Sequence, residues 1–337
     1  MKKGLSRFLI GLLVAAFFLA VLGFWFSLKS NVQGRSAIYI NIPGDSDFED
    51  VKRILDPHLQ SAWTFQVVAH LRDYPNLVKS GRYKIEPNMG NLEIVHVLRA
   101  GIQEPVMVTI PAPKSLGDLC FLLAKQLELD SAQLKSAFEI QFKEMGISPK
   151  HYACYLIPNT YEFYWNASSS QVFEQLHLEY KKFWNEDREA KAKKLKLSFC
   201  EVSTLASIVQ KETSKVDEMP IIAGVYLNRL KIGMRLQADP TLIFAAKNKE
   251  IKRVLNVDKD LNSPYNTYKY AGLPPGPICI PDVVAMEAVL NAKKHQYLYF
   301  CAKEDFSGYH NFARTYSEHL KNAAKYQREL NRRGILR

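Results

Sequence analysis

Leu205-Ala206-Ser207-Ile208-Val209-Gln210-Lys211-Glu212-Thr213 is the stretch that decides the fold of the C-terminal part of the chain. Its apolar residues and Glu212 recur at i, i+3, i+4 and i+7, which is the spacing of a core-facing helical stripe. A carboxyl group held against apolar walls resists ionisation, and one that keeps its proton near neutral pH can act as a general acid. The spacing leaves one alternative open, a helix-end carboxylate that turns out into water.

The segments after Glu212 carry more polar residues than packing requires. They are Asn228-Arg229, Gly233-Met234-Arg235-Leu236-Gln237-Ala238-Asp239-Pro240, Pro264-Tyr265-Asn266-Thr267-Tyr268, Gly272-Leu273-Pro274-Pro275-Gly276-Pro277-Ile278 and His310-Asn311-Phe312. This ordered series resembles the endolytic murein transglycosylases of the MltG/YceG type. The resemblance implies an α+β fold with an N-terminal transmembrane helix, a small LysM-like α+β subdomain and a larger mixed α+β catalytic domain with a helical insert.

The resemblance also implies an activity, lytic cleavage of the β-1,4 bond between N-acetylmuramic acid and N-acetylglucosamine in nascent peptidoglycan strands. Ordinary glycosidases use two carboxylates. In this family the C6 hydroxyl of the sugar is the nucleophile, so that one carboxyl group acts first as acid and then as base and leaves a 1,6-anhydro-muramyl end. By resemblance Glu212 is that residue. Many members have Glu-Lys-Glu where this chain has Gln210-Lys211-Glu212, so residue 210 cannot be the essential acid.

Further residues are candidates for substrate binding on family grounds, namely Asn228, Arg229, Gln237, Asp239, Tyr265, Asn266, Thr267, Tyr268 and His310. Amides suit N-acetyl and hydroxyl groups, an arginine suits a carboxylate, and tyrosines in a loop can stack on sugars. Structural alternatives stay open: Asp239 can cap a helix, Arg229 can pair with an internal acid, and His310 can be a satisfied structural histidine. The chain has no catalytic triad, P-loop or zinc spacing, so we expect neither a metal nor a cofactor.

The N-terminus predicts a membrane anchor. Phe8 to Leu28 is a stretch of 21 residues without a formal charge, and as a helix it spans about 31 Å, against about 30 Å for a hydrocarbon core. Lys2, Lys3 and Arg7 precede it, so the positive-inside rule keeps residues 1–7 in the cytoplasm. A cleaved signal peptide is the rival interpretation, although its apolar region is usually only about 7–15 residues long. We therefore expect a single-pass protein of the cytoplasmic (inner) membrane with an extracytoplasmic or periplasmic catalytic domain.

The exported part divides into three predicted segments. Residues 29–36 form a polar linker, residues 37–110 the LysM-like subdomain, and residues 111–337 the catalytic domain, with a helical portion at about 115–197. Strands are expected at 37–42, 81–85 and 106–110, and helices at 61–74, 115–127, 131–139 and 170–195. Ser46 with Glu49 predicts a capping box, and Asn91 and Gly101 predict the two ends of another helix. LysM modules bind N-acetylglucosamine polymers, so the resemblance implies glycan contact; a spacer is the alternative.

The net charge limits the classes of partner that we expect, and the cysteine spacing limits the roles of the thiols. The formal net charge of +11 suggests anionic surroundings, but nucleic acid is the weakest candidate because the chain is expected outside the cytoplasm. Peptidoglycan strands and the cytoplasmic membrane are the predicted partners, and the family implies peptidoglycan synthases and elongation or division machinery. The cysteines show no C-x-x-C spacing and are interpreted as small buried hydrophobes, with a disulfide left open; they are Cys120, Cys154, Cys200, Cys279 and Cys301.

Two other functions remain open at this point. One is a hydrolytic muramidase or glucosaminidase that uses Glu212 together with Asp239. The other is a non-catalytic, membrane-tethered peptidoglycan-binding protein.

Overall fold

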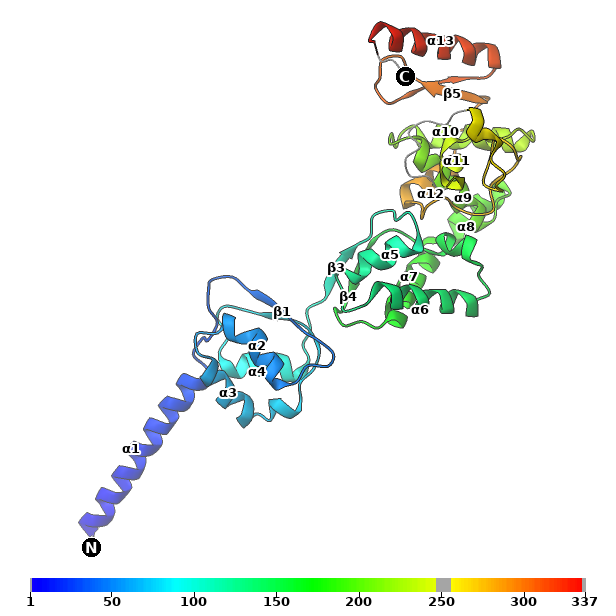
Figure 1. Cartoon of the computed structure of the whole chain (residues 1–337). Coiled ribbons are helices and arrows are strands. Elements are labelled where there is room, and N and C mark those ends of the chain that lie inside the picture. The colour runs from blue at the N-terminus through cyan, green and yellow to red at the C-terminus, as the bar shows by residue number, and fades with distance from the viewer. Residues whose placement is uncertain (1, 247–255, 335–337) are drawn as a thin grey trace. The chain divides into compact units, whose positions relative to one another are not determined.

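The computed structural model describes residues 2–246 and 256–334. Its contacts divide the chain into two compact units, and Figure 1 labels their helices and strands. The first unit comprises Met1–Val108 with residues 124–129 and 162–168, and the second comprises Thr109–Leu123, Asp130–Tyr161 and Ser169–Arg337.

The first unit begins with the long helix α1 (Lys2–Ser27). Its segment Ile10–Ser27 is long and apolar enough to cross a membrane, and none of that segment is buried within the protein. The helix starts six residues before the predicted span, which began at Phe8.

The rest of this unit is built around one antiparallel pair of strands. β1 (Ile38–Ile42) pairs with β2 (Gly81–Ile85), with Ile40 opposite Tyr83. The helices α2 (Phe48–Leu55) and α3 (Ala62–Leu71) lie between the two strands in the sequence, with the short 3₁₀ turns η1 (Asp56–His58) and η2 (Tyr74–Asn76), and α4 (Asn91–Ala100) follows β2. The apolar faces of these elements form one core, which includes Ile42, Val51, Leu55, Phe65, Tyr83, Ile94 and Leu98.

Three details of this unit differ from the predictions. The capping box of α2 uses Asp47 and Asp50, one residue after the predicted Ser46 and Glu49. Asn91 is the first residue of α4 and is buried, while Gly90 occupies the cap position. The expected linker at 29–36 is instead bonded into the unit, because Asn31 and Val32 are buried and form bridges or hydrogen bonds with its loops. Gly101 ends α4 at φ 75°, as predicted.

The strand predicted at 106–110 is β3 (Val106–Thr109), and it pairs with β4 (Thr160–Phe163) rather than with β1 or β2. This part of the sequence also forms the helices α5 (Leu116–Ala124), α6 (Ser131–Glu144), the turn η3 (Pro149–Tyr155), α7 (Ser169–Phe183) and α8 (Glu186–Leu195). The single helix expected at 170–195 is therefore two, because the side chain of Asn185 accepts a hydrogen bond from Arg188 N at 3.0 Å and starts a new helix.

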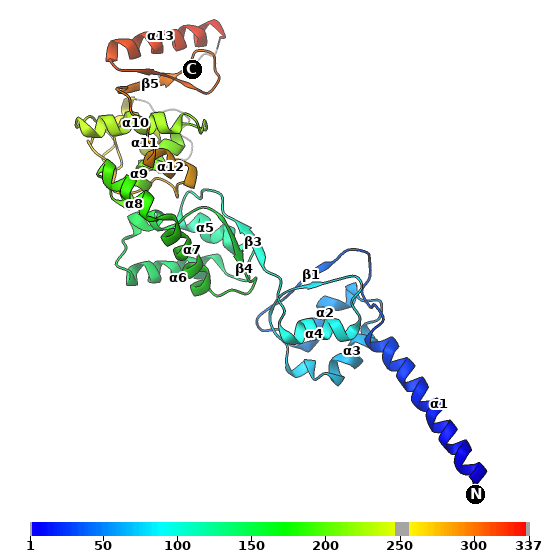
Figure 2. The ribbon, with the colours of Figure 1, turned by 180° about the vertical axis from the view of Figure 1, so that it is seen from behind.

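The core of the second unit is formed by α9 (Phe199–Glu212), α10 (Met219–Lys231) and α12 (Val283–Leu290). Figures 1 and 2 both show α9 beside these helices and α11 (Asp239–Ala245). The turn η4 (Asn256–Asp260) precedes the Pro-rich segments. The chain ends with the hairpin β5 (Tyr299–Ala302) and β6 (His310–Ala313) and with α13 (Tyr316–Arg332). The predicted burial of Leu205, Ile208 and Val209 is confirmed, but α9 is buried on its other sides as well, since every residue from Val202 to Val209 is buried.

Candidate active site

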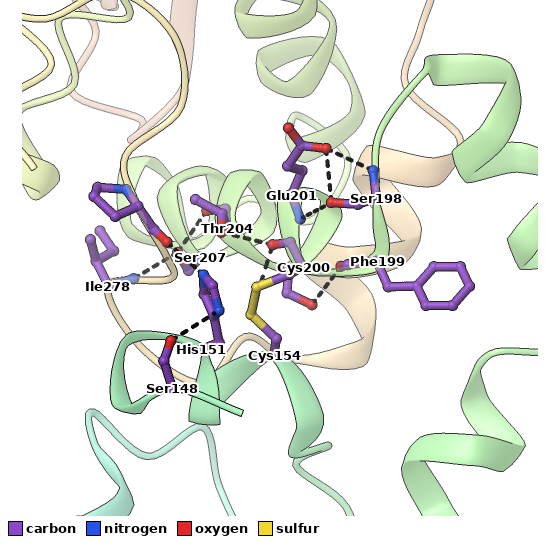
Figure 3. The surroundings of a disulfide bond; sticks show 12 residues. Ser148, His151, Cys154, Ser198, Phe199, Cys200, Glu201, Thr204, Ser207 and Ile278 are labelled. Carbon is purple, nitrogen blue, oxygen red and sulfur yellow. Dashed lines mark hydrogen bonds between the residues drawn. A yellow bond between two sulfur atoms is a disulfide. The ribbon is translucent and has the colours of Figure 1, made fainter. Parts of the chain in front are cut away.

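The helix that carries Glu212 is anchored at its first turn. A capping box joins Ser198 and Glu201: Glu201 N donates to Ser198 Oγ at 3.3 Å and Ser198 N to Glu201 Oε2 at 2.8 Å. A disulfide between Cys154 and Cys200 ties the same turn to η3 (Figure 3). The interpretation of all five cysteines as free hydrophobes was therefore wrong for this pair. Cys120 and Cys279 are buried thiols as expected, and Cys301 is half-buried.

The middle of α9 holds the Pro-rich segment 272–278. Ser207 Oγ accepts a hydrogen bond from Ile278 N at 3.0 Å (Figure 3), and a nitrogen of the His151 ring lies 3.0 Å from the carbonyl oxygen of Pro275. Gly276 approaches the neighbouring backbone so closely that a Cβ there would lie 2.2 Å from Lys150 O. The segment is thus fixed against the helix that ends in Glu212.

Gln210 makes a structural pair with Asp282. Its Nε2 donates to Asp282 Oδ2 at 2.9 Å and its Oε1 accepts from Asp282 N at 2.8 Å. These bonds hold the start of α12, so residue 210 serves the frame of the site.

Glu212 is the last residue of α9 and is half-buried. The pKa of its carboxyl is raised to about 7, mainly by burial and also by the nearby Asp239 carboxylate, while a hydrogen bond from Tyr226 and the charge of Arg229 act in the opposite direction. A carboxyl group with this pKa is protonated and ionised in comparable amounts near neutral pH. It can both give and take a proton there.

Tyr226 orients the carboxyl group, and the sequence analysis did not single it out. Its hydroxyl donates to Glu212 Oε1 at 2.6 Å, and its side chain, in α10, is only 1% exposed. Burial raises the pKa of Tyr226 well above its ordinary value, so the hydroxyl stays a donor. Oε1 is therefore occupied as an acceptor, and within residues 2–246 and 256–334 no hydrogen-bond partner is found for Oε2. Oε2 is thus the oxygen that is available to carry the carboxyl proton. A tyrosine within the otherwise apolar run from Met219 to Leu227 in α10 was the available signal, since a buried hydroxyl needs a partner.

Arg229 supplies a fixed positive charge next to this pair. It follows Tyr226 by one helical turn and is 6% exposed. Its Nε donates to Leu298 O at 2.6 Å and its NH1 group to Leu236 O at 2.5 Å. Burial lowers its pKa, but an arginine keeps its proton at any working pH.

Asp239 and Tyr268 form the more exposed side of the site. The Tyr268 hydroxyl donates to Asp239 Oδ1, at the first residue of α11. Burial and the charges of Asp239 and Glu212 raise the pKa of Tyr268, while Arg229 lowers it, so all four groups share one electrostatic environment. Lys259 lies 5.1 Å from the centre of the Tyr268 ring.

Asn266 and Thr267 are buried and hold the loop that presents Tyr268. Asn266 Nδ2 donates to Lys259 O at 2.9 Å and to Leu261 O at 2.8 Å. Thr267 Oγ1 accepts from Ala238 N at 3.0 Å. Their polar groups are thus directed at the protein backbone.

The remaining candidates lie around this group. Asn228 Nδ2 donates to His295 O at 2.9 Å and Tyr297 O at 3.0 Å, which fixes the approach to β5. Tyr265 packs on Phe244, with ring centres 4.8 Å apart. Gln237 is exposed at a φ of 50°, and its backbone N donates to Thr267 O at 3.1 Å.

His310 lies outside the group formed by Glu212 and Tyr226. Its Nδ1 lies 2.9 Å from Oε2 of Glu218, a carboxylate that is buried at the start of α10. The His310 ring packs edge-on against Phe300, and Phe300 packs edge-on against Tyr226. Phe300 therefore separates His310 from Tyr226, and Glu218 is a further residue that the sequence analysis missed.

The geometry has the features of a general acid–base site. In the part of the chain that the structure describes, no group of three or more histidine, cysteine and carboxylate side chains is placed to hold a metal ion. The model of the YceG-like family matches residues 40–325, and the chain belongs to this family.

Named relatives and a solved structure agree with this membership. The chain is 30% identical to an endolytic murein transglycosylase of Bacillus subtilis over 87% of this chain and 85% of that protein. It is 27% identical to an endolytic murein transglycosylase of Streptococcus pneumoniae, of which the match covers 60%. A 2.6 Å crystal structure described as that of a YceG-like protein from Listeria monocytogenes has a TM-score of 0.56 and 29% identity, over 86% of this chain and 99% of that one.

Proposed function

We propose that the chain is an endolytic lytic transglycosylase that cleaves the MurNAc–GlcNAc β-1,4 bond of nascent peptidoglycan strands, with Glu212 as its single general acid and base. The observation that carries the proposal is the half-buried Glu212 carboxyl, whose pKa is raised to about 7 beside the donor Tyr226. The names of the relatives support the substrate class.

In the first half of the reaction, the proton on Glu212 Oε2 passes to the bridging oxygen as the C1–O bond of the muramyl residue breaks. Positive charge then develops at C1. In the second half, the C6 hydroxyl of the same sugar attacks C1 and returns its proton to the carboxylate. The product is a 1,6-anhydro end, no water is consumed, and the enzyme regains its starting protonation state.

Tyr226 acts on the carboxyl group in both halves of this cycle. Its hydroxyl donates to Oε1 throughout, so it stabilises the carboxylate formed in the first half and leaves Oε2 to move the proton. Arg229 adds a positive charge that favours the same ionised state. Asp239 and Tyr268 are proposed to contact the sugar from the exposed side, and Gln237 is proposed to contact an N-acetyl or hydroxyl group.

We further propose that α1 anchors the chain in the cytoplasmic membrane, with the N-terminus in the cytoplasm and the catalytic unit outside. The apolar segment Ile10–Ser27 supports an anchor, and the lysines and arginine before it support the orientation. Contact between glycan and the LysM-like subdomain predicted at 37–110, and association with peptidoglycan synthases or with elongation or division machinery, stay predictions.

Digestion of purified peptidoglycan strands tests the enzymatic proposal. The wild type should release fragments with 1,6-anhydro-muramyl ends, and Glu212→Gln should lower the rate by about 10²–10⁴-fold. Glu201→Gln is the matched control on the same helix and should retain activity, because Glu201 is an exposed cap residue. Unchanged activity in Glu212→Gln rules out the assigned role.

One observation favours a second function, hydrolysis with two carboxylates. Asp239 lies close enough to raise the pKa of Glu212, and a second carboxylate is what a hydrolase requires. Mass spectrometry of the products decides between them, since reducing muramic or glucosamine ends indicate hydrolysis and anhydro ends indicate transglycosylation. A protein that binds strands without cutting them would be the non-catalytic alternative.

A further inference from the structure

The end of α1 is bonded into the first unit without a flexible joint. Asn91 Nδ2 donates to Phe26 O at 2.7 Å, and Phe26 packs against the hydrophobic core of the unit. Gly90 lies so close to the last turn of α1 that a Cβ there would be 2.7 Å from Ser27 O. These contacts therefore fix which side of the unit lies next to the end of α1.

That side is occupied by α3. Trp63, near the start of α3, packs edge-on against Phe26, with ring centres 5.4 Å apart. Arg72, just after the end of α3, lines a hollow together with Ser27 and Leu28. Figures 1 and 2 both show α3 where α1 enters the unit. The helix therefore packs against the end of α1.

The outer face of α3 carries an apolar stripe beside the exposed His70. Trp63, Val67 and Leu71 follow each other at i, i+4 and i+8, so they form one stripe on the helix. Trp63 is 63% exposed and Leu71 is 79% exposed, while Val67 is half-buried. The opposite face, with Phe65, Val68 and Ala69, is the one that packs into the core. Because α3 has apolar residues on both faces, its outer face is available to bind an apolar surface other than the core of the unit.

A cationic and an aromatic group lie near the end of α1, and Arg72, followed by the exposed Asp73, lies at the end of α3. Lys29 lies 3.6 Å from the centre of the exposed Trp25 ring, one turn before the end of α1. Arg72 is exposed at the other end of the stripe. Tryptophan is enriched at the level of lipid headgroups, and lysine and arginine are attracted to anionic headgroups. An interfacial helix combines these features with an apolar face.

We propose that α3 lies in the phospholipid interface of the membrane that α1 crosses, with Trp63 and Leu71 inserted at headgroup level and Lys29 and Arg72 facing lipid phosphates. The inference rests on the proposed anchoring by α1. It goes further, because it makes the first unit a membrane-bound body with one defined face on the lipid rather than a unit suspended above it.

Depth-dependent fluorescence quenching tests this arrangement. The full chain is reconstituted into vesicles of phosphatidylcholine and phosphatidylglycerol that contain lipids brominated near the headgroup end of their acyl chains. The chain has four tryptophans, so three single-tryptophan variants are made by phenylalanine substitution, retaining Trp25, Trp63 or Trp184. Circular dichroism checks their folding. If the triple replacements do not fold, the quenched component lost in Trp63→Phe relative to the wild type gives the same information.

We expect brominated lipid to reduce Trp63 emission by an amount similar to the loss at Trp25, with iodide in the water having little effect on either. Trp184, buried in the core of the second unit, should respond to neither brominated lipid nor iodide. If Trp25 is quenched by lipid and Trp63 only by iodide, the interfacial placement of α3 is overturned and the anchor stands. If neither is quenched by lipid, the anchoring proposal fails, and the inference fails with it.

Discussion

Replacing Glu212 by glutamine should make the protein more stable at alkaline pH, although it removes the proposed acid. The pKa of the folded carboxyl is raised from 4.5 to about 7 by burial, with Asp239 adding to the effect. The unfolded carboxyl ionises at its ordinary pKa, so between these two values the native state binds more protons than the unfolded state. Stability therefore falls as the pH rises through this window.

The magnitude follows from the same two values. Each tenfold change in acidity is worth about 1.36 kcal/mol, so the full effect is about 3 kcal/mol above pH ~7, about 1 kcal/mol near pH ~5, and close to zero below pH ~4. Glutamine has nearly the same shape, cannot ionise, and its carbonyl still accepts the Tyr226 hydroxyl. The Glu212→Gln variant should therefore gain about 3 kcal/mol near pH ~8 and about 1 near pH ~5.

Denaturant unfolding of the full chain in detergent, at both pH values, measures this difference. Glu174→Gln, on the exposed face of α7, is the matched control and should change stability by less than about 0.5 kcal/mol. The reasoning is refuted if Glu212→Gln gains nothing near pH ~8, or gains the same amount at both pH values. Either result would mean that burial does not hold the carboxyl in its protonated form.

Three further changes test the parts that position Glu212. Tyr226→Phe removes a hydrogen bond to the Glu212 carboxylate that is worth about 1.5–3 kcal/mol, so the pKa of Glu212 should rise. The alkaline limb of kcat/KM against pH should therefore move up by about 1–2 pH units. The control Tyr83→Phe loses a hydrogen bond to a backbone carbonyl and should leave the pH profile unchanged. Cys154→Ser with Cys200→Ser opens a loop with a sequence separation of 46 and should lower stability by about 4 kcal/mol in thermal or denaturant unfolding; equal stability under oxidising conditions would contradict the disulfide. Gly276→Ala places a Cβ 2.2 Å from Lys150 O and should lower stability by about 1–3 kcal/mol, whereas Gly117→Ala, whose nearest neighbour would be 3.7 Å away, should not.

Local sequence patterns predicted the elements whose stability is local. The 3.6-residue period predicted the stripe of α9, and the glycine after α4 predicted its end at Gly101. The start of α2 was missed by one residue because Ser46 and Asp47 are both good caps, and only the side chain that reaches the N3 amide decides between them. The strand at 81–85 was predicted with its observed bounds.

Features that depend on distant contacts escaped prediction. The disulfide joins residues 46 apart in the sequence, and the pairing of β3 with β4 joins segments about as far apart. Tyr226 meets Glu212 across two helices, and its role depends on where the connection through residues 213–218 sends the second helix. No periodicity within either helix contains that information.

The density of polar residues around Glu212 has a physical explanation apart from catalysis. The segments after α10 contain little regular structure, so their backbone groups lack ladder partners, and a buried backbone group needs a partner from somewhere. Asn228, Asn266 and Thr267 each supply hydrogen bonds to backbone atoms of these segments. A motif of this kind thus encodes a rigid irregular frame as much as a set of substrate contacts. The proton chemistry then needs only a few groups held by that frame, since one carboxyl with a raised pKa and one fixed donor suffice to give a proton and take it back.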